Sequence, residues 1–76
     1  MKIINSEHWK RKRKYRKDIT DDIIEYAIKN SNELRDKYWE NALNAICRVP
    51  LSGRILKVVY RLEKNKIKII TAFWLD

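Results

Sequence analysis

The sequence predicts an α+β fold, with helices in the first part of the chain and an antiparallel hairpin at the carboxyl end. Two observations carry this prediction. Apolar residues recur at helical spacing along residues 20–30, and they alternate along residues 54–62 and 67–75. A chain of 76 residues is expected to form one domain, residues 1–76, because too little remains to build a second core.

The amino-terminal segment is expected to form a short strand followed by a helix. Residues 1–4 can begin the strand, and Asn5 or Ser6 can cap a helix that starts near Glu7. This helix runs into a basic stretch whose neighbouring cations repel one another, so we expect one face to be packed or anions to lie near it. Trp9 is expected to pack the helix against the sheet.

The second helix is predicted by its caps and by its apolar stripe. Thr20 is a good N-cap, and Asp21 and Asp22 lie in the first turn, where the helix dipole favours negative charge. The stripe consists of Ile23, Ile24, Ala27 and Ile28. The helix should end near residues 30–32. Residues 33–49 fit both a helical stripe and a half-buried strand, and periodicity does not decide between them.

The carboxyl-terminal part predicts a hairpin of two alternating strands. The first strand places Leu56, Val58, Tyr60 and Leu62 on one face and Ile55, Lys57, Val59 and Arg61 on the other. The second strand is expected to place Ile67, Ile69, Thr71, Phe73 and Leu75 on one face. Trp74 then lies on the opposite face of this strand and is expected to be exposed.

The positive charge is concentrated near the amino terminus. Residues 10–17 carry seven of the cations that make up a net charge of +8, which leaves +1 for the rest of the chain. Such a tract binds polyphosphate by releasing counterions, and Trp9 and Tyr15 could add base stacking if they face the ligand. The candidate nucleic-acid-binding residues are Lys10, Arg11, Lys12, Arg13, Lys14, Arg16, Lys17 and Arg54. The alternatives for this tract are a solvated face or a patch for an acidic protein.

Other classes of protein are disfavoured. A lone Cys47 cannot form an intramolecular disulfide, and one histidine with one cysteine gives no metal-ligand cluster, so we expect no metal and no cofactor. The apolar runs are far shorter than the roughly 20 residues that span a bilayer, and the start lacks a signal-peptide pattern. A cytoplasmic protein without a membrane partner is therefore expected.

The sequence resembles the small toxin-like domains related to BrnT and, more distantly, to the RelE and ParE toxins of toxin-antitoxin loci. The residues that carry this resemblance are His8, the run 10–17, the segment Lys17-Asp18-Ile19-Thr20, the strand 55–60 and the segment Ile69-Ile70-Thr71-Ala72. Lys17 stands where the family pattern has arginine, and its spacing from His8 is longer than in the pattern. The resemblance covers most of the chain apart from residues 33–50.

The resemblance implies a more detailed fold and a function. The fold would be amino-terminal helices packed on a small twisted antiparallel sheet of three or four strands, as in RelE-like and barnase-like toxins, with residues 43–49 as a strand. The function would be a metal-independent endoribonuclease acting on mRNA within a type II toxin-antitoxin system. The implied partners are RNA, free or on the ribosome, a cognate antitoxin protein, and a second copy of the chain in a homodimer.

The residues themselves allow such a reaction. RNA carries its own nucleophile, the 2′-OH, so the protein needs a base, a proton for the leaving 5′ oxygen, and cations for the phosphate. His8 is the first candidate base, because imidazole is the side chain best suited to proton transfer near neutral pH. The candidate catalytic set is His8, Arg13, Arg61 and Tyr60. Alternatively, His8 is a half-exposed surface residue and Tyr60 a core residue.

Two other functions stay open. The first is a non-catalytic nucleic-acid-binding module, favoured by the small catalytic inventory. The second is a ParE-like inhibitor of a topoisomerase.

Overall fold

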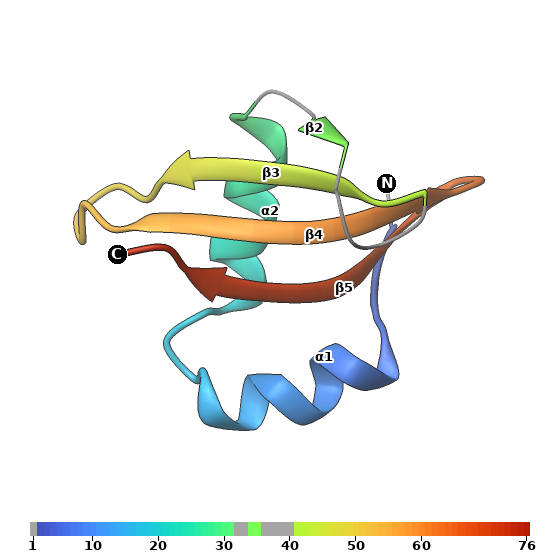
Figure 1. Ribbon diagram of the computed structural model, residues 1–76, viewed down its shortest axis with the longest axis horizontal. Helices are drawn as coiled ribbons and strands as arrows, with labels where there is room; N and C mark the ends of the chain where they lie inside the picture. Colours follow the sequence, from blue (N-terminus) through green and yellow to red (C-terminus); the bar gives the residue numbers. More distant parts are fainter. Residues whose placement is uncertain (1, 32–33, 36–40) are drawn as a thin grey trace.

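The structure, a computed structural model, describes residues 2–31, 34–35 and 41–76. Its elements in chain order are β1 (Lys2–Asn5), α1 (Glu7–Lys12), the 3₁₀ turn η1 (Arg13–Tyr15), α2 (Asp21–Lys29), β2 (Leu34–Arg35), β3 (Leu43–Arg48), β4 (Ile55–Glu63) and β5 (Lys66–Trp74). In the described part of the chain these strands form one sheet with the order β1-β5-β4-β3-β2 (Figure 1). The α+β class predicted from the sequence is therefore confirmed.

The sheet is mixed, and the prediction of a purely antiparallel sheet is wrong. β3, β4 and β5 pair antiparallel, but β1 runs parallel to β5, with Ile3 opposite Ile67. The edge of the final strand carries hydrogen-bonding groups that need partners, and the amino-terminal residues supply them. The chain returns to this edge only after α1, α2 and the other strands, and such a long connection permits parallel pairing.

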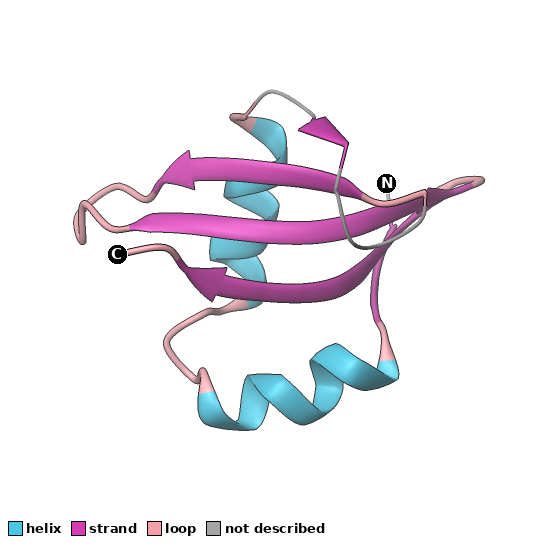
Figure 2. Cartoon of the chain, in the orientation of Figure 1, coloured by secondary structure: helices cyan, strands magenta, loops and turns pink. Residues whose placement is uncertain are grey.

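The helix α2 covers one side of the sheet. Figure 2 shows α2 lying across the sheet, where it contacts β3 and β4. Its residues Ile24 and Ala27 are buried in the core. Its start is the predicted one, because the Thr20 hydroxyl accepts a hydrogen bond from the Ile23 N–H at 3.3 Å. Asn30 forms the C-cap. The local capping and periodicity signals were therefore sufficient to predict this helix.

The helix α1 packs against β5, whereas α2 packs against β3 and β4 (Figure 1). Ser6 caps it by accepting a hydrogen bond from the Trp9 N–H at 3.1 Å. The Trp9 side chain is 0% exposed and belongs to the main core, which confirms its predicted packing role. The helix ends at Lys12, so the second half of the basic run forms η1 and the loop to α2.

A β-bulge divides β5 and changes which residues share a face. Val59 lies opposite Thr71 and Tyr60 lies opposite Ile69, so Ile70 is an extra residue in β5. Beyond the bulge the alternation is reversed, and Trp74 lies on the core side, opposite Leu56. The predicted face from Ile67 to Leu75 is therefore wrong after Ile69, and Trp74 is partly buried against the core.

The segment with ambiguous periodicity forms strands where the structure describes it. Residues Leu43–Arg48 pair with β4, which confirms the strand interpretation for this part. Trp39, for which the sequence favours a place in the core, lies outside the described residues.

Two apolar clusters lie on the two sides of the sheet. The main core lies between the sheet and the helices, and its largest buried side chains are Trp9, Tyr60, Ile19, Ile24, Leu56, Ile69 and Val58. A smaller cluster on the other side comprises Ala42, Val59 and Ile70. We call this second side the open face of the sheet, because α2 does not lie on it.

Candidate nucleic-acid interface

The basic run contains cations whose side chains are bound within the protein. Lys10 Nζ lies 3.3 Å from Glu7 Oε1, and Arg13 Nη2 lies 3.0 Å from Asp21 Oδ1 at the start of α2. Arg16 Nη1 donates to the Ala72 carbonyl at 3.0 Å and to the Thr71 hydroxyl at 3.3 Å. We call Lys10, Arg13 and Arg16 the anchored cations.

Arg16 completes the closure of the β5 edge beyond the end of β1. The Ser6 N–H donates to the Ile69 carbonyl at 2.9 Å, and the Ser6 hydroxyl donates to the Ile70 carbonyl at 3.1 Å. Arg16 then satisfies the carbonyl of Ala72. Because unpaired carbonyls at a strand edge are costly or promote aggregation, this arginine has a structural role.

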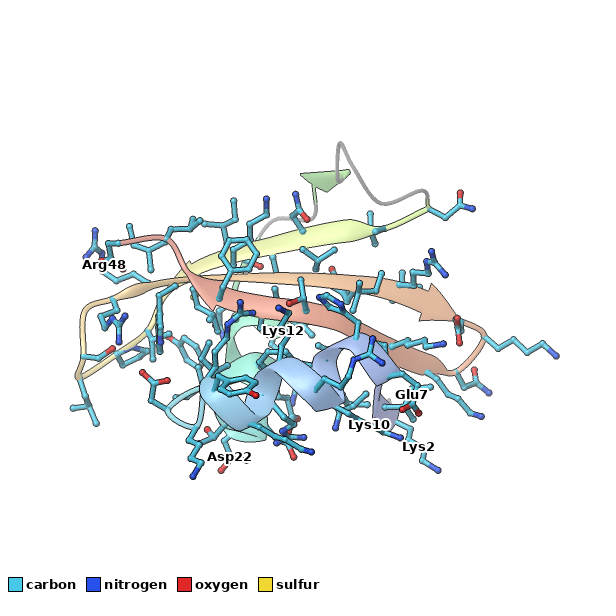
Figure 3. All side chains as sticks on the ribbon, turned by 60° about the horizontal axis from the view of Figure 1, so that its bottom comes forward. Lys2, Glu7, Lys10, Lys12, Asp22 and Arg48 are labelled. Atoms are coloured by element: carbon cyan, nitrogen blue, oxygen red, sulfur yellow. The ribbon has the colours of Figure 1, made fainter. Side chains whose placement is uncertain are left out.

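The remaining cations of the run project into solvent. They are Arg11, Lys12, Lys14 and Lys17, which we call the projecting cations. All are exposed, and none takes part in an ion pair between described residues. Figure 3 shows Lys10 beside Glu7 and Lys12 on the other side of α1. The structure therefore leaves four exposed positive charges on this segment, and three of them, Arg11, Lys12 and Lys14, line one hollow.

Tyr15 lies among the projecting cations. Its side chain is 87% exposed, in contrast to the buried Trp9. Together with Arg11, Lys12 and Lys14 it lines an open hollow of about 350 Å³. Of the two aromatic residues of the basic segment, only Tyr15 is accessible to a ligand.

His8 occupies a position beside this surface. It lies on α1 three residues before Arg11 and four before Lys12, a spacing that places the three side chains along one flank of the helix. The imidazole is half-buried, in accord with the half-exposed position weighed above.

The candidate catalytic set does not converge on one point. Tyr60 is 1% exposed and belongs to the main core, which confirms the core interpretation. Arg61 follows it on β4, and its side chain points to the open face, because successive residues of a strand alternate. Arg13 is bound to Asp21 of α2. His8 alone of the four lies on the flank of α1 next to the projecting cations.

Arg54 is also engaged within the protein. Its Nη1 donates to Asp18 Oδ2 at 3.1 Å, and the same oxygen accepts a hydrogen bond from Trp74 Nε1 at 2.9 Å. The guanidinium lies 4.2 Å from the centre of the Trp74 ring. Arg54 therefore fastens the end of the sheet to the loop before α2.

The open face carries cations that the count of charges along the chain did not reveal. Arg61 and Lys68 lie directly opposite each other on β4 and β5, and Lys57 Nζ lies 5.7 Å from the Phe73 ring. Like charges in opposite positions destabilise a sheet. The acidic residues Asp21, Asp22 and Glu25 lie on α2. The nearly neutral charge of the chain outside residues 10–17 therefore hides a separation of positive from negative charge. The signal in the sequence that could have placed Lys57 and Arg61 together on this face was the alternation along β4.

Two further properties concern the described residues only. They contain no group of three histidine, cysteine or acidic side chains that could hold a metal ion, and none of their helices combines the length and apolarity needed to cross a membrane.

On α2, the hydrogen bond and charge of Lys29 lower the pKa of Glu25 below its ordinary value.

Comparisons with protein-family models, with curated proteins and with solved structures find no match to this chain.

Proposed function

We propose that the protein binds RNA through its sugar-phosphate backbone at the surface formed by the projecting cations. The observation that carries this proposal is the separation of the basic run into two groups. Arg13 and Arg16 bind η1 and the following loop to α2 and β5, Lys10 pairs with Glu7 within α1, and four exposed cations remain beside them without an ion pair among the described residues. A row of phosphates is the ligand that matches such a surface.

The energetics support an anionic ligand. Neighbouring cations of the run, such as Arg11 and Lys14, repel one another, because the consecutive turns of α1 and η1 keep their backbones close together. A polyanion relieves this repulsion and releases its own condensed counterions, so the affinity should fall steeply with salt. The positive field should also accelerate the encounter with RNA. The resemblance of the sequence to toxin-like domains favours RNA over DNA as the ligand.

The proposal is tested by replacing the lysines of this surface. The variant Lys12→Gln, Lys14→Gln, Lys17→Gln should bind a single-stranded RNA more weakly. The plot of log affinity against log salt has a negative slope, and this slope should become shallower by about two, since each lost phosphate contact contributes about 0.7. Electrophoretic mobility shift over a salt series measures both quantities.

A matched control separates local from total charge. The variant Lys2→Gln, Lys29→Gln, Lys64→Gln loses three positive charges from exposed positions outside the basic run. It should keep the affinity and the slope of the unmodified protein. Equal behaviour of the two triple variants would contradict the proposed surface.

A second candidate function is the toxin-like, metal-independent endoribonuclease. The observation in its favour is the position of His8 on the flank of α1 that carries Arg11 and Lys12. In this reaction the imidazole takes the proton of the 2′-OH, and the 2′ oxygen attacks phosphorus. The bond from phosphorus to the 5′ oxygen breaks, and that oxygen takes up a proton from water or the imidazolium. The products are a 2′,3′-cyclic phosphate and a 5′-hydroxyl, and the neighbouring cations stabilise the charge on the phosphate.

Cleavage is tested with a long RNA in EDTA. The unmodified protein should yield fragments that end in cyclic phosphate, and His8→Asn should bind the RNA but leave it intact. Intact RNA with the unmodified protein would remove the enzymatic function and leave the binding module. A topoisomerase inhibitor would also leave RNA intact but damage DNA in cells.

The proposed protein partner can be tested at the same surface. A cognate antitoxin with an acidic segment would neutralise the projecting cations and compete with RNA. Addition of such a partner should displace bound RNA, and the triple variant at Lys12, Lys14 and Lys17 should bind it more weakly.

A further inference from the structure

Tyr15 is an aromatic side chain that the fold leaves in solvent. Its exposed fraction of 87% exceeds that of Tyr26, the other exposed tyrosine of the described residues, which is 39% exposed. It therefore contributes almost nothing to the core. A large ring in this position is available to a ligand at no cost to the folded structure.

The backbone around Tyr15 is held on both sides. Arg13 is bound to Asp21, and Arg16 is bound to Thr71 and Ala72 of β5. The Arg16 N–H also donates to the Arg13 carbonyl at 3.2 Å, which closes the 3₁₀ turn over Tyr15. The ring is thus attached to a fixed support, and less conformational freedom is lost when a ligand binds it.

The surroundings of the ring select the ligand. Arg11, Lys12 and Lys14 line the same hollow as Tyr15, so a group that stacks on the ring has cations directly beside it. An apolar partner surface would leave these charges without counterions, and a second copy of this chain would bring like charges together. A nucleobase with its adjoining phosphates satisfies both the ring and the cations.

We infer that Tyr15 stacks on an unpaired base of the bound RNA while Arg11, Lys12 and Lys14 hold the adjacent phosphates, so that the protein selects single-stranded RNA over duplex RNA. This inference rests on the proposed function and specifies its substrate class. In a duplex each base is stacked between its neighbours and offers no face to the protein. A single strand can turn one base out onto the tyrosine at little cost.

The test compares a short unstructured RNA with a duplex of the same length. Tyr15→Leu keeps an apolar side chain but removes the aromatic face, and it should lower the affinity for the single strand about 5- to 150-fold. The affinity for the duplex should stay unchanged. Tyr15→Phe keeps the aromatic face and should bind the single strand as the unmodified protein does. Tyr26→Leu, on α2, is the matched control and should bind as the unmodified protein does.

A second readout reports stacking directly. A single strand that contains one 2-aminopurine should change its fluorescence when it binds the unmodified protein or Tyr15→Phe, and less so with Tyr15→Leu. Tyr15 is exposed, so these variants should fold, which far-ultraviolet circular dichroism verifies.

Each other outcome overturns the inference. If Tyr15→Leu binds the single strand as tightly as the unmodified protein does, or loses the same affinity for single strand and duplex, then Tyr15 does not select unpaired bases. In either case the lysine variants still decide the proposed function separately. If the unmodified protein binds neither RNA, both proposals fail.

Discussion

Trp74 Nε1 donates a hydrogen bond to Asp18 Oδ2 across 2.9 Å and so joins the last strand to the loop that precedes α2. Arg54 donates to the same oxygen at 3.1 Å and lies over the Trp74 ring. This three-residue contact connects the residue before β4, the last residue of β5 and the loop that follows the basic run. It holds the segment with the projecting cations in position relative to the sheet.

Asp18→Ala should lower the free energy of unfolding by about 0.5–1.5 kcal/mol, the usual net value of a hydrogen bond, because Arg54 and Trp74 lose their shared acceptor. The effect stays modest since both charged side chains are partly exposed and water can replace the carboxylate. Urea unfolding measures it. Glu63→Ala, which removes an exposed carboxylate at the end of β4 that takes part in no ion pair between described residues, is the control, and an equal loss in both variants would contradict the contact.

Arg16 and Lys17 should respond in opposite ways to substitution although they are neighbours in the basic run. Arg16→Ala leaves the Ala72 carbonyl without its donor and should lower the free energy of unfolding by about 1–3 kcal/mol. Lys17→Ala should leave stability unchanged and weaken RNA binding. Thermal unfolding and the salt dependence of binding distinguish the two effects. Similar stability losses would show that the separation into anchored and projecting cations is wrong.

Trp9 should be the most sensitive position of α1. Trp9→Ala removes a fully buried side chain and should lower the free energy of unfolding by about 3–5 kcal/mol, enough to unfold much of so small a domain. Trp9→Phe should cost clearly less, because it also removes an indole N–H that is buried without a hydrogen-bond acceptor. Urea unfolding of both variants checks the order, and equal losses would contradict the packing role of the Trp9 ring.

Lys29→Gln should raise the pKa of Glu25 towards its ordinary value, because Lys29 supplies the hydrogen bond and the charge that lower it. A folded-state pKa below the unfolded value contributes stability that is present above the unfolded pKa. This contribution is lost as the pH falls through the folded pKa. Titration of the Glu25 carboxylate by nuclear magnetic resonance measures the shift. An unchanged pKa in Lys29→Gln would contradict the assignment of the shift to Lys29.

Elements with local signals could be predicted from the sequence. The start of α2 at Thr20, the cap of α1 at Ser6 and the hairpin of β4 and β5 depend on contacts within a few residues, and the structure has all three. The bulge at Ile70 could not be predicted in this way, because it depends on how β5 pairs with β4 and not on the residues of β5 alone. It places Trp74 on the core side of the sheet.

The candidate site was predicted as a region but not residue by residue. Seven adjacent cations marked α1 and its continuation, yet their roles depend on partners that are remote in sequence. Arg16 binds Thr71 across a separation of 55 residues, and Arg13 binds Asp21 on the next helix. Sequence spacing contains no information about such partners.

By itself the sequence determined the two helices, the hairpin, the buried Trp9 and the concentration of positive charge, because periodicity, capping and composition act over short distances. Tertiary structure alone decided that β1 pairs parallel to β5, that the bulge at Ile70 places Trp74 on the core side, and that Tyr15 remains exposed. The physical reason is that strand pairing and side-chain hydrogen bonds join residues far apart in the chain, as Ser6 and Ile70 are across 64 positions.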